Sequence, residues 1–241
     1  MYNNFDTKKV IITIAVLFAA YWLYSSLQSG DLLGTLLMLP GLILAITIHE
    51  FSHAKMADRL GDPTPEAQGR VTLNPMAHID PIGMICLLVA GFGWGKPVQI
   101  DPSRMRNPAR DSMLVALAGP VSNFILAFIS FLAYGILYFA LPIDTQWGMI
   151  LLTMVYVCAQ INLSLGVFNL LPFPPLDGSK ILVYFLKGKA KAFIWNLERY
   201  SYIILAVLYF TELPSILITP VINWIGNAMI AIVEKILVLF I

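Results

Sequence analysis

His49, Glu50 and His53 form an H-E-x-x-H pattern inside a long apolar run. At about 3.6 residues per helical turn, residues four positions apart lie on one face, so both imidazoles can bind one metal ion. Zinc held by three protein ligands keeps a fourth position for water, whose pKa falls to roughly 7 from about 15.7 in bulk. Glu50 is placed to take a proton from that water and return it. The pattern therefore predicts zinc-dependent hydrolysis.

The apolar run around this pattern is long enough to cross a bilayer. Ionisable groups within a bilayer are costly and are functional by default. The alternative is that these side chains only pack within a helix, as a single core histidine usually does. Two of the three histidines in the chain flank a glutamate at ligand spacing, which favours a metal site. We therefore expect hydrolysis within a membrane.

Composition excludes an ordinary soluble domain. The chain has 241 residues, of which 59% are hydrophobic and only 12% are charged, whereas soluble domains carry about 25% charged residues. The net charge of +1 gives no reason to expect binding to nucleic acid. Cys86 and Cys158 lie in apolar stretches without C-x-x-C spacing, which is typical of buried thiols. The expected partner is a lipid bilayer.

The elements that must position the pattern are long apolar helices, because a membrane span needs about 20 apolar residues. We predict an all-α membrane protein with six transmembrane helices, the first of them retained and not a cleaved signal peptide. Their expected ranges are 9–28, 32–58, 110–141, 147–170, 195–212 and 214–240. Residues 82–92 are apolar but too short to span, and residues 96–100 alternate as a strand does. This predicts a short re-entrant or β-hairpin segment between the second and third spans.

Charge sets the expected orientation and organisation. All fifteen Lys and Arg residues fall on one side of a six-span arrangement, and by the positive-inside rule that side is cytoplasmic. Both termini are then cytoplasmic in a multi-pass cell-membrane protein. The chain shows no internal repeat or long linker, so we expect one domain over 1–241, with a catalytic core at about 32–187.

A third metal ligand is suggested by Asp177, which follows a proline-rich break after the fourth expected span. The prolines prevent regular helix and let the carboxylate point towards the centre. The alternative is an acidic cap on the following helix. Depth below the membrane surface supports the ligand role. Arg59 and Arg110 mark the cytoplasmic surface, and at helical rise His49 lies about 15 Å from Arg59 and Asn123 about 20 Å from Arg110. These polar groups fall in one layer.

The chain resembles the site-2 protease family of intramembrane zinc metalloproteases. The resemblance is carried, in family order, by His49–His53, Gly69–Pro75 followed by His78, Asp80 and Pro81, Gly119–Asn123, and Asn169–Gly178. These blocks extend across most of residues 45–180, which is far more specific than one H-E-x-x-H match. Because neither a PDZ nor a CBS module is found, the chain resembles the compact members, and how it selects substrates stays open.

The resemblance implies roles for individual residues. His49, His53 and Asp177 would bind one zinc ion per chain, and Glu50 would be the catalytic acid and base. The substrates would be transmembrane helices of other proteins.

The resemblance also implies that Asn123 and Asn169 hold the substrate backbone or stabilise the oxyanion, although an interhelical hydrogen bond is the alternative for either asparagine. His78 stays open as an alternate ligand, a group that supports a ligand, or a loop residue at the interface.

Two other functions compete with proteolysis. A divalent-metal transporter could use His49, His53 and Asp177 as a transit site, because intramembrane acids and histidines mark ion pathways. A silent relative could bind membrane helices without cutting them, but the intact Glu50 and ligand set disfavour this alternative.

Overall fold

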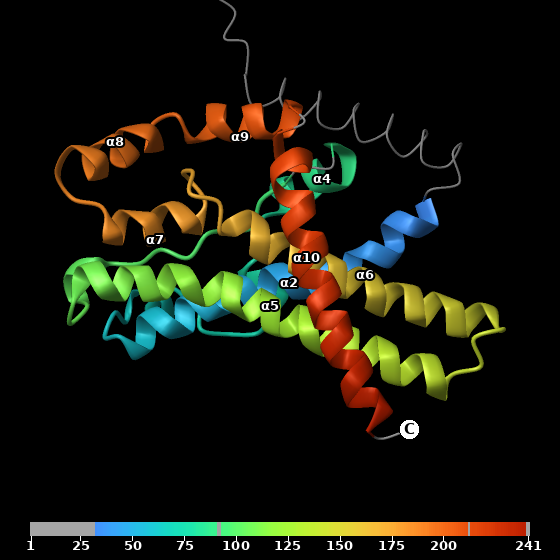
Figure 1. Ribbon diagram of the computed structural model, residues 1–241. Helices are drawn as coiled ribbons and strands as arrows, with labels where there is room; N and C mark the ends of the chain where they lie inside the picture. Colours follow the sequence, from blue (N-terminus) through green and yellow to red (C-terminus); the bar gives the residue numbers. More distant parts are fainter. Residues whose placement is uncertain (1–31, 91–92, 212, 240–241) are drawn as a thin grey trace, which may run out of the picture.

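The computed structural model describes residues 32–90, 93–211 and 213–239, and this part of the chain is almost entirely helical (Figure 1). The α-helices are α2 (Leu32–Arg59), α3 (Thr64–Ala67), α4 (Pro81–Ala90), α5 (Pro108–Ala140), α6 (Gln146–Asn169), α7 (Asp177–Phe185), α8 (Gly188–Glu198), α9 (Ser201–Phe210) and α10 (Leu213–Val238). Two short 3-10 helices are η1 (Pro75–Ala77) and η2 (Pro102–Arg104). The predicted helical class is confirmed.

Four helices among the described residues, α2, α5, α6 and α10, are long and apolar enough to cross a membrane. They coincide with the spans predicted at 32–58, 110–141, 147–170 and 214–240. The span predicted at 9–28 lies outside the described residues. The structure therefore supports a membrane protein, and the six-span count is not confirmed.

The span predicted at 195–212 differs from the structure. Here the chain forms parts of two short helices: α8 has 11 residues and ends at Glu198, and α9 has 10 residues and begins at Ser201. Neither approaches the roughly 20 residues that a crossing needs. The break falls directly after the charged pair Glu198 and Arg199, and charged groups are costly within lipid. Apolar content alone therefore overestimated this segment.

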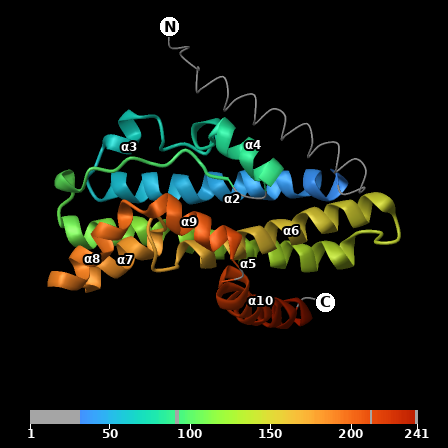
Figure 2. The ribbon, with the colours of Figure 1, turned by 90° about the horizontal axis from the view of Figure 1, so that it is seen from above.

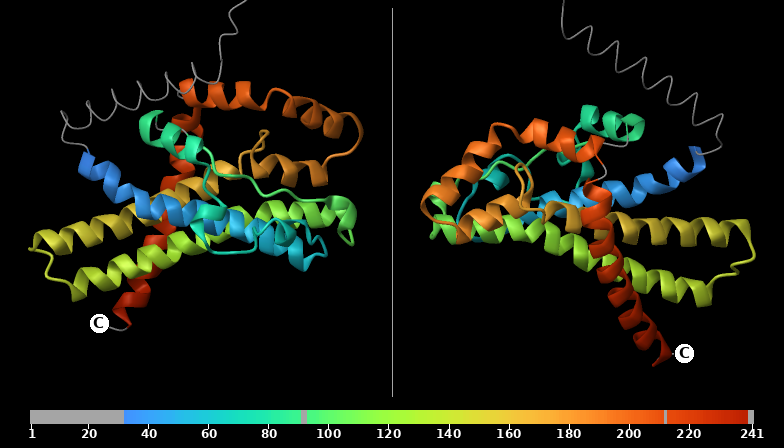
Figure 3. Two further views of the ribbon diagram at one scale, coloured as in Figure 1. Left: turned by 180° about the vertical axis from the view of Figure 1, so that it is seen from behind. Right: turned by 45° about the horizontal axis from the view of Figure 1, so that its top comes forward.

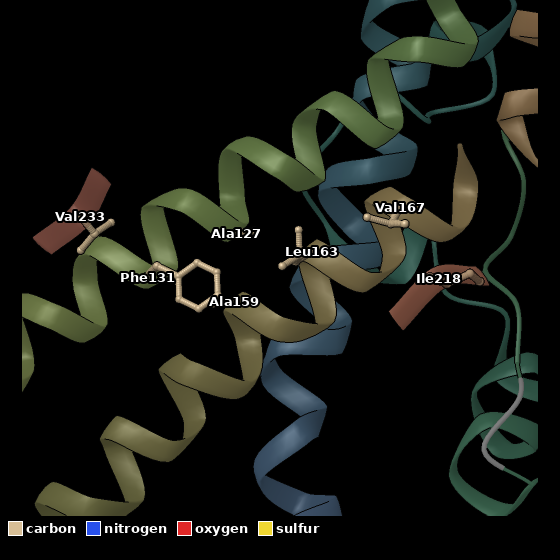
Figure 4. Packing of buried hydrophobic residues seen from close by; sticks show 7 residues of the cluster. All are labelled: Ala127, Phe131, Ala159, Leu163, Val167, Ile218 and Val233. Carbon is tan, nitrogen blue, oxygen red and sulfur yellow. The ribbon is translucent and has the colours of Figure 1, made fainter. Parts of the chain in front are cut away.

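The core is a hairpin of α5 and α6, with α2 packed on one side and α10 on the other (Figures 1 and 2). Thr145 caps the N-terminus of α6: its side chain accepts a hydrogen bond from the Gly148 N–H, so α6 begins directly after the short turn that follows α5. Seven buried apolar side chains join α5, α6 and α10: Ala127, Phe131, Ala159, Leu163, Val167, Ile218 and Val233 (Figure 4). The small Ala127 and Ala159 let helices approach closely in this cluster.

The approach of α2 to α6 depends on Gly41. A β-carbon at this position would lie 2.8 Å from Cα of Cys158 on α6. Close backbone approach of this kind is typical of small residues in membrane helix pairs. The contact fixes where α2 crosses the hairpin and hence where its second half, with the H-E-x-x-H pattern, lies.

After α6 the chain passes through its proline-rich break and continues beyond it as α7, which packs against α5 (Figure 3). Gly178 makes this close packing possible, because a β-carbon there would overlap the carbonyl oxygens of Leu170 and Leu171. The start of α7 is thereby held against the end of α6. The neighbouring Asp177 is then directed towards α2.

Between α2 and α5 the described chain forms short helices and extended loops in place of the expected hairpin. An isolated antiparallel bridge joins Ile79 to Gly95, and α4 lies between these two residues. No strand is assigned at residues 96–100 or elsewhere in the described ranges. The β-hairpin is therefore reduced to a single bridge, and re-entry into the membrane stays a prediction.

Candidate metal centre and active site

Three ligand atoms from distant parts of the chain meet beside α2. The Nε2 atoms of His49 and His53 are 3.0 Å apart, and each lies 3.1 Å from Oδ2 of Asp177. All three residues are buried. Asp177 is separated from His53 by 124 positions in the sequence. Folding thus assembles the set that could hold a metal ion.

The outer nitrogen of each imidazole is fixed by a hydrogen bond. Nδ1 of His53 donates to the carbonyl oxygen of Val115 at 2.7 Å. Nδ1 of His49 donates to Oδ1 of Asn123 at 2.6 Å. The Asn123 amide group donates to the Ala45 carbonyl at 3.1 Å and to Oδ1 of Asn162 at 2.9 Å, so its own Oδ1 must be the acceptor. Each Nε2 of a neutral imidazole therefore presents a lone pair to the centre.

Two lone pairs and a carboxylate oxygen this close together need a cation between them, either shared protons or a metal ion. Burial opposes ionisation of the Asp177 carboxyl, but the neighbouring His53 and contacts with both imidazoles outweigh it and lower the pKa well below its usual range. Ligand atoms of tetrahedral zinc, with bonds of about 2.0–2.1 Å, lie about 3.3 Å apart. The observed triangle fits zinc after a small expansion.

The backbone of α5 closes one side of this centre at Gly119. A β-carbon on Gly119 would lie 2.5 Å from Nε2 of His53 and 2.7 Å from Cε1 of His49. Glycine is therefore required for α5 to lie against both imidazoles. The following residue, Pro120, lacks an N–H and so disturbs the helical hydrogen bonds one turn earlier in α5. The Val115 carbonyl, which accepts the hydrogen bond from His53, lies in that turn.

Glu50 lies next to the ligands on α2 and is only partly buried. Its Oε2 atom accepts a hydrogen bond of 3.1 Å from the backbone N–H of Val98. The extended segment that contains Val98 passes close to α2, because a β-carbon on Gly95 would lie 3.0 Å from Cγ2 of Ile46 and 3.8 Å from Oε1 of Glu50. Glu50 is therefore oriented by a second part of the chain.

The remaining predicted residues occupy different surroundings. Asn123 is fully buried, and its amide group is already bonded to two protein oxygens. Asn169 ends α6 and donates to the Leu165 carbonyl at 3.1 Å. His78 is buried, and its Nε2 donates to the Thr72 carbonyl at 2.8 Å. Within the described residues, the structure brings His49, His53, Asp177 and Asn123 together. The His78 ring bonds within its own loop, and the His78 carbonyl accepts a hydrogen bond from the Lys96 N–H.

Three contributors to the site were not anticipated from the sequence: the Val115 carbonyl, the Val98 N–H and Asn162. Backbone groups carry no sequence signal, so the first two could not have been found. Asn162 could have been found, because it is a polar residue within a long apolar helix, where such residues usually bond to another helix. It completes a hydrogen-bonded path from His49 through Asn123 to the Cys158 carbonyl.

Replacement of Asn123 by alanine should weaken zinc binding by roughly 10- to 100-fold, the usual loss when a ligand histidine loses its outer partner. The physical reason is that His49 would no longer be held with its Nε2 facing the metal. Equilibrium zinc titration against a competing chelator measures this loss, and Asn227→Ala at an exposed position of α10 is the control. A variant with unchanged zinc affinity and a reduced cleavage rate would instead favour a contact with substrate.

The fold and site together define a helical membrane protein with a His-His-Asp metal centre and an adjacent glutamate, as in metal-dependent hydrolases. Comparison with known sequences agrees. The sequence profile of Peptidase family M50 matches residues 135–211, a range that includes Asp177.

Relatives over most of the chain are named as zinc metalloproteases. YwhC of Bacillus subtilis (strain 168) is 40% identical over 190 residues, which cover 76% of this chain and 84% of the relative. Rip2 of Mycolicibacterium smegmatis is 31% identical, covering 78% and 69% of the two chains. MJ0611 of Methanocaldococcus jannaschii is 28% identical, covering 80% and 89%. No solved structure matches the chain significantly.

The chain therefore belongs to peptidase family M50, the site-2 protease family, and it is a zinc metalloprotease. Its His49, His53 and Asp177 group suits the zinc ion that the names of its relatives specify.

Proposed function

We propose that this metalloprotease hydrolyses peptide bonds within or near transmembrane helices of other membrane proteins, as in regulated intramembrane proteolysis. His49, His53 and Asp177 are the zinc ligands, and Glu50 is the catalytic acid and base. One observation carries the proposal: three ligand atoms 3.0–3.1 Å apart lie beside a helix long enough to cross a membrane. A centre placed there is suited to substrates that are themselves in the bilayer.

The arrangement in the membrane is part of the proposal. We infer a multi-pass protein of the cell membrane with one domain over 1–241 and a catalytic core at about 32–187. Most basic residues lie between α2 and α5 or between α6 and α10, so the positive-inside rule places these segments in the cytoplasm, as it does the N-terminus before the span proposed at 9–28. Because residues 195–212 do not form a span, α10 starts on the cytoplasmic side, and the C-terminus that was expected in the cytoplasm lies on the opposite side. The metal centre is then reached from the cytoplasmic half of the bilayer.

The chemistry is divided between the metal and the chain. When bound, zinc supplies a Lewis acid that polarises the scissile carbonyl and makes water a better nucleophile at neutral pH. Glu50 takes a proton from the attacking water and delivers it to the leaving amine. Val98 holds the Glu50 carboxylate through its N–H, while Asn123 and Val115 hold the two imidazoles.

A substrate helix protects its peptide bonds by internal hydrogen bonding, so the helix must unwind locally before cleavage. Asn169 is the residue we propose to contact the unwound substrate. It ends α6, directly before the loop that leads to Asp177, and its amide bonds only to the preceding turn among the described contacts. Because Asn123 is fully engaged with the protein, we assign it to holding His49.

The proposal is tested with purified protein in lipid vesicles together with a single-span test protein. We expect release of a soluble fragment, loss of release after treatment with a zinc chelator, and recovery when zinc is added back. Gel analysis and mass spectrometry of the fragment locate the cut. Cleavage outside the membrane segment and its immediate flanks would contradict an intramembrane site.

The same vesicles distinguish the transporter alternative. A transporter would move zinc into vesicles that hold a trapped zinc dye and would not require the Glu50 carboxylate. We expect no protein-dependent zinc entry, and entry without any fragment release would overturn the proposed function.

A further inference from the structure

Arg70 is a buried cation that the catalytic scheme above does not use. Only 6% of its surface is exposed. Its guanidinium donates hydrogen bonds to three backbone carbonyls, those of Ala77, Lys96 at 3.3 Å and Pro97 at 3.2 Å. No carboxylate pairs with it in the part of the chain that the structure describes. A buried charge that is satisfied by carbonyls alone must be held firmly, because desolvation is costly.

The local sequence directs Arg70 inward. Gly69 follows the short helix α3 with a φ of +67°, a conformation that favours glycine. The Gly69 N–H donates to the Glu66 carbonyl and the Arg70 N–H donates to the Pro65 carbonyl. This pair of bonds is the Schellman motif, in which the chain reverses direction at the end of a helix. Arg70 is the first residue after the reversal.

The carbonyls that Arg70 binds come directly before the donor that holds Glu50. Lys96 and Pro97 give their carbonyls to Arg70, and the next residue, Val98, gives its N–H to Oε2 of Glu50. The same segment is fixed at its start, where the Lys96 N–H donates to the His78 carbonyl at 2.7 Å. The position of the Val98 N–H is thus set from both sides.

The approach of this segment to α2 leaves little freedom. Gly95 packs against Ile46, which lies one helical turn before Glu50 on the same face of α2. A shift of the segment away from α2 would remove the Val98 N–H from the carboxylate. A shift along α2 would be resisted by the contacts with Arg70 and His78.

We propose that Arg70 is a positioning residue for Glu50: its guanidinium fixes the backbone at Lys96 and Pro97 so that the Val98 N–H orients the catalytic carboxylate. The inference rests on the proposed function. Arginine suits this task because its planar fork presents several donors in fixed directions, whereas lysine presents a compact point charge on a flexible stem. Arg70→Lys is therefore not a conservative change here.

A purely structural role for Arg70 makes a different prediction. If Arg70 only stabilised the loop, its replacement would reduce the amount of folded protein or its zinc content. A positioning role lowers kcat in protein that is folded and fully loaded with zinc, and it leaves KM unchanged. The two roles are separated by measuring these quantities together.

The experiment compares Arg70→Gln, Val98→Pro and the double variant in the vesicle cleavage assay. Val98→Pro removes the N–H that reaches Glu50. We expect each single change to lower kcat by roughly 10- to 100-fold, as is usual when a supporting partner is lost, with KM and zinc content unchanged. The double variant should be no slower than the slower single variant, because both changes break the same connection.

A matched control and a second measurement complete the test. Arg106→Gln makes the same change at an exposed arginine and should cleave at the wild-type rate. Hydrogen–deuterium exchange of the peptide that covers residues 95–100 should increase in Arg70→Gln and not in Arg106→Gln. If Arg70→Gln does not fold, Arg70→Lys takes its place and should show the same changes to a smaller extent.

Three results would overturn the inference: an increase in KM at unchanged kcat, loss of zinc from the Arg70 variants, or additive losses in the double variant. These results are distinct from failure of the proposed function. If the wild type does not cleave, both proposals fall, whereas if the wild type cleaves and Arg70→Gln retains its kcat, only the role of Arg70 falls.

Discussion

Glu50→Gln is expected to abolish peptide cleavage while zinc stays bound. A carboxamide cannot accept the proton of the attacking water, and loss of general acid and base catalysis typically costs roughly 10²–10⁴-fold in rate. The proposed zinc ligands His49, His53 and Asp177 are untouched. The Gln side chain also keeps an oxygen that can accept the 3.1 Å hydrogen bond from the Val98 N–H. Cleavage rates and metal content of the same purified samples check both halves of the expectation.

The control for this variant is Glu66→Gln, which makes the same chemical change at an exposed glutamate outside the site. It should cleave at the wild-type rate. A Glu50→Gln protein that still releases fragment at a comparable rate would remove Glu50 from the mechanism. Loss of zinc together with activity would show instead that Glu50 supports the metal centre.

The two histidines of the proposed metal centre could be predicted from the sequence because their spacing has a direct geometric meaning. Residues four positions apart on a helix face the same way, and two histidines with a glutamate between them are rarely accidental in an apolar helix. Asp177 was harder to predict, because an acid at the start of a helix is also a common cap. The structure places its carboxylate within 3.1 Å of both imidazoles, a contact between segments that no local pattern contains.

The parts that could not be predicted depend on tertiary contacts. The partners of His53 and Glu50 are the Val115 carbonyl and the Val98 N–H, and any residue type could provide either group. The fifth expected span was misjudged for a related reason. Hydropathy averages over a window, whereas the chain breaks locally after Glu198, where charges are costly to place in lipid.

The buried polar residues of α5 and α6 have a common physical explanation. Asn123 and Asn162 lie in helices that are otherwise apolar, and both are fully buried. An unpaired amide in such surroundings is unfavourable, so each amide must find a partner. The partners form one path from His49 to the backbone of α6. The same bonds that satisfy these amides also fix the orientation of His49, a proposed metal ligand.

Gly119→Ala is expected to disrupt the metal centre more severely than loss of a single hydrogen bond. The added methyl group would lie 2.5 Å from Nε2 of His53 and 2.7 Å from Cε1 of His49, which is well inside van der Waals contact. Both imidazoles, or α5 itself, must move, and overpacking of this kind typically costs about 1–3 kcal/mol. Zinc affinity should fall by at least the roughly 10- to 100-fold expected for loss of one outer partner, and cleavage should fall with it.

Gly226→Ala provides the matched control, because Gly226 is also a buried glycine within a long helix. Its added methyl group would meet the flexible end of Leu163 at 3.1 Å and no ligand of the metal. Zinc titration and cleavage assays on both variants separate the local clash from the general effect of alanine on a helix. Normal zinc affinity in Gly119→Ala would mean that α5 can withdraw from the imidazoles without cost, and the close packing of α5 on the centre would then have no part in binding the metal.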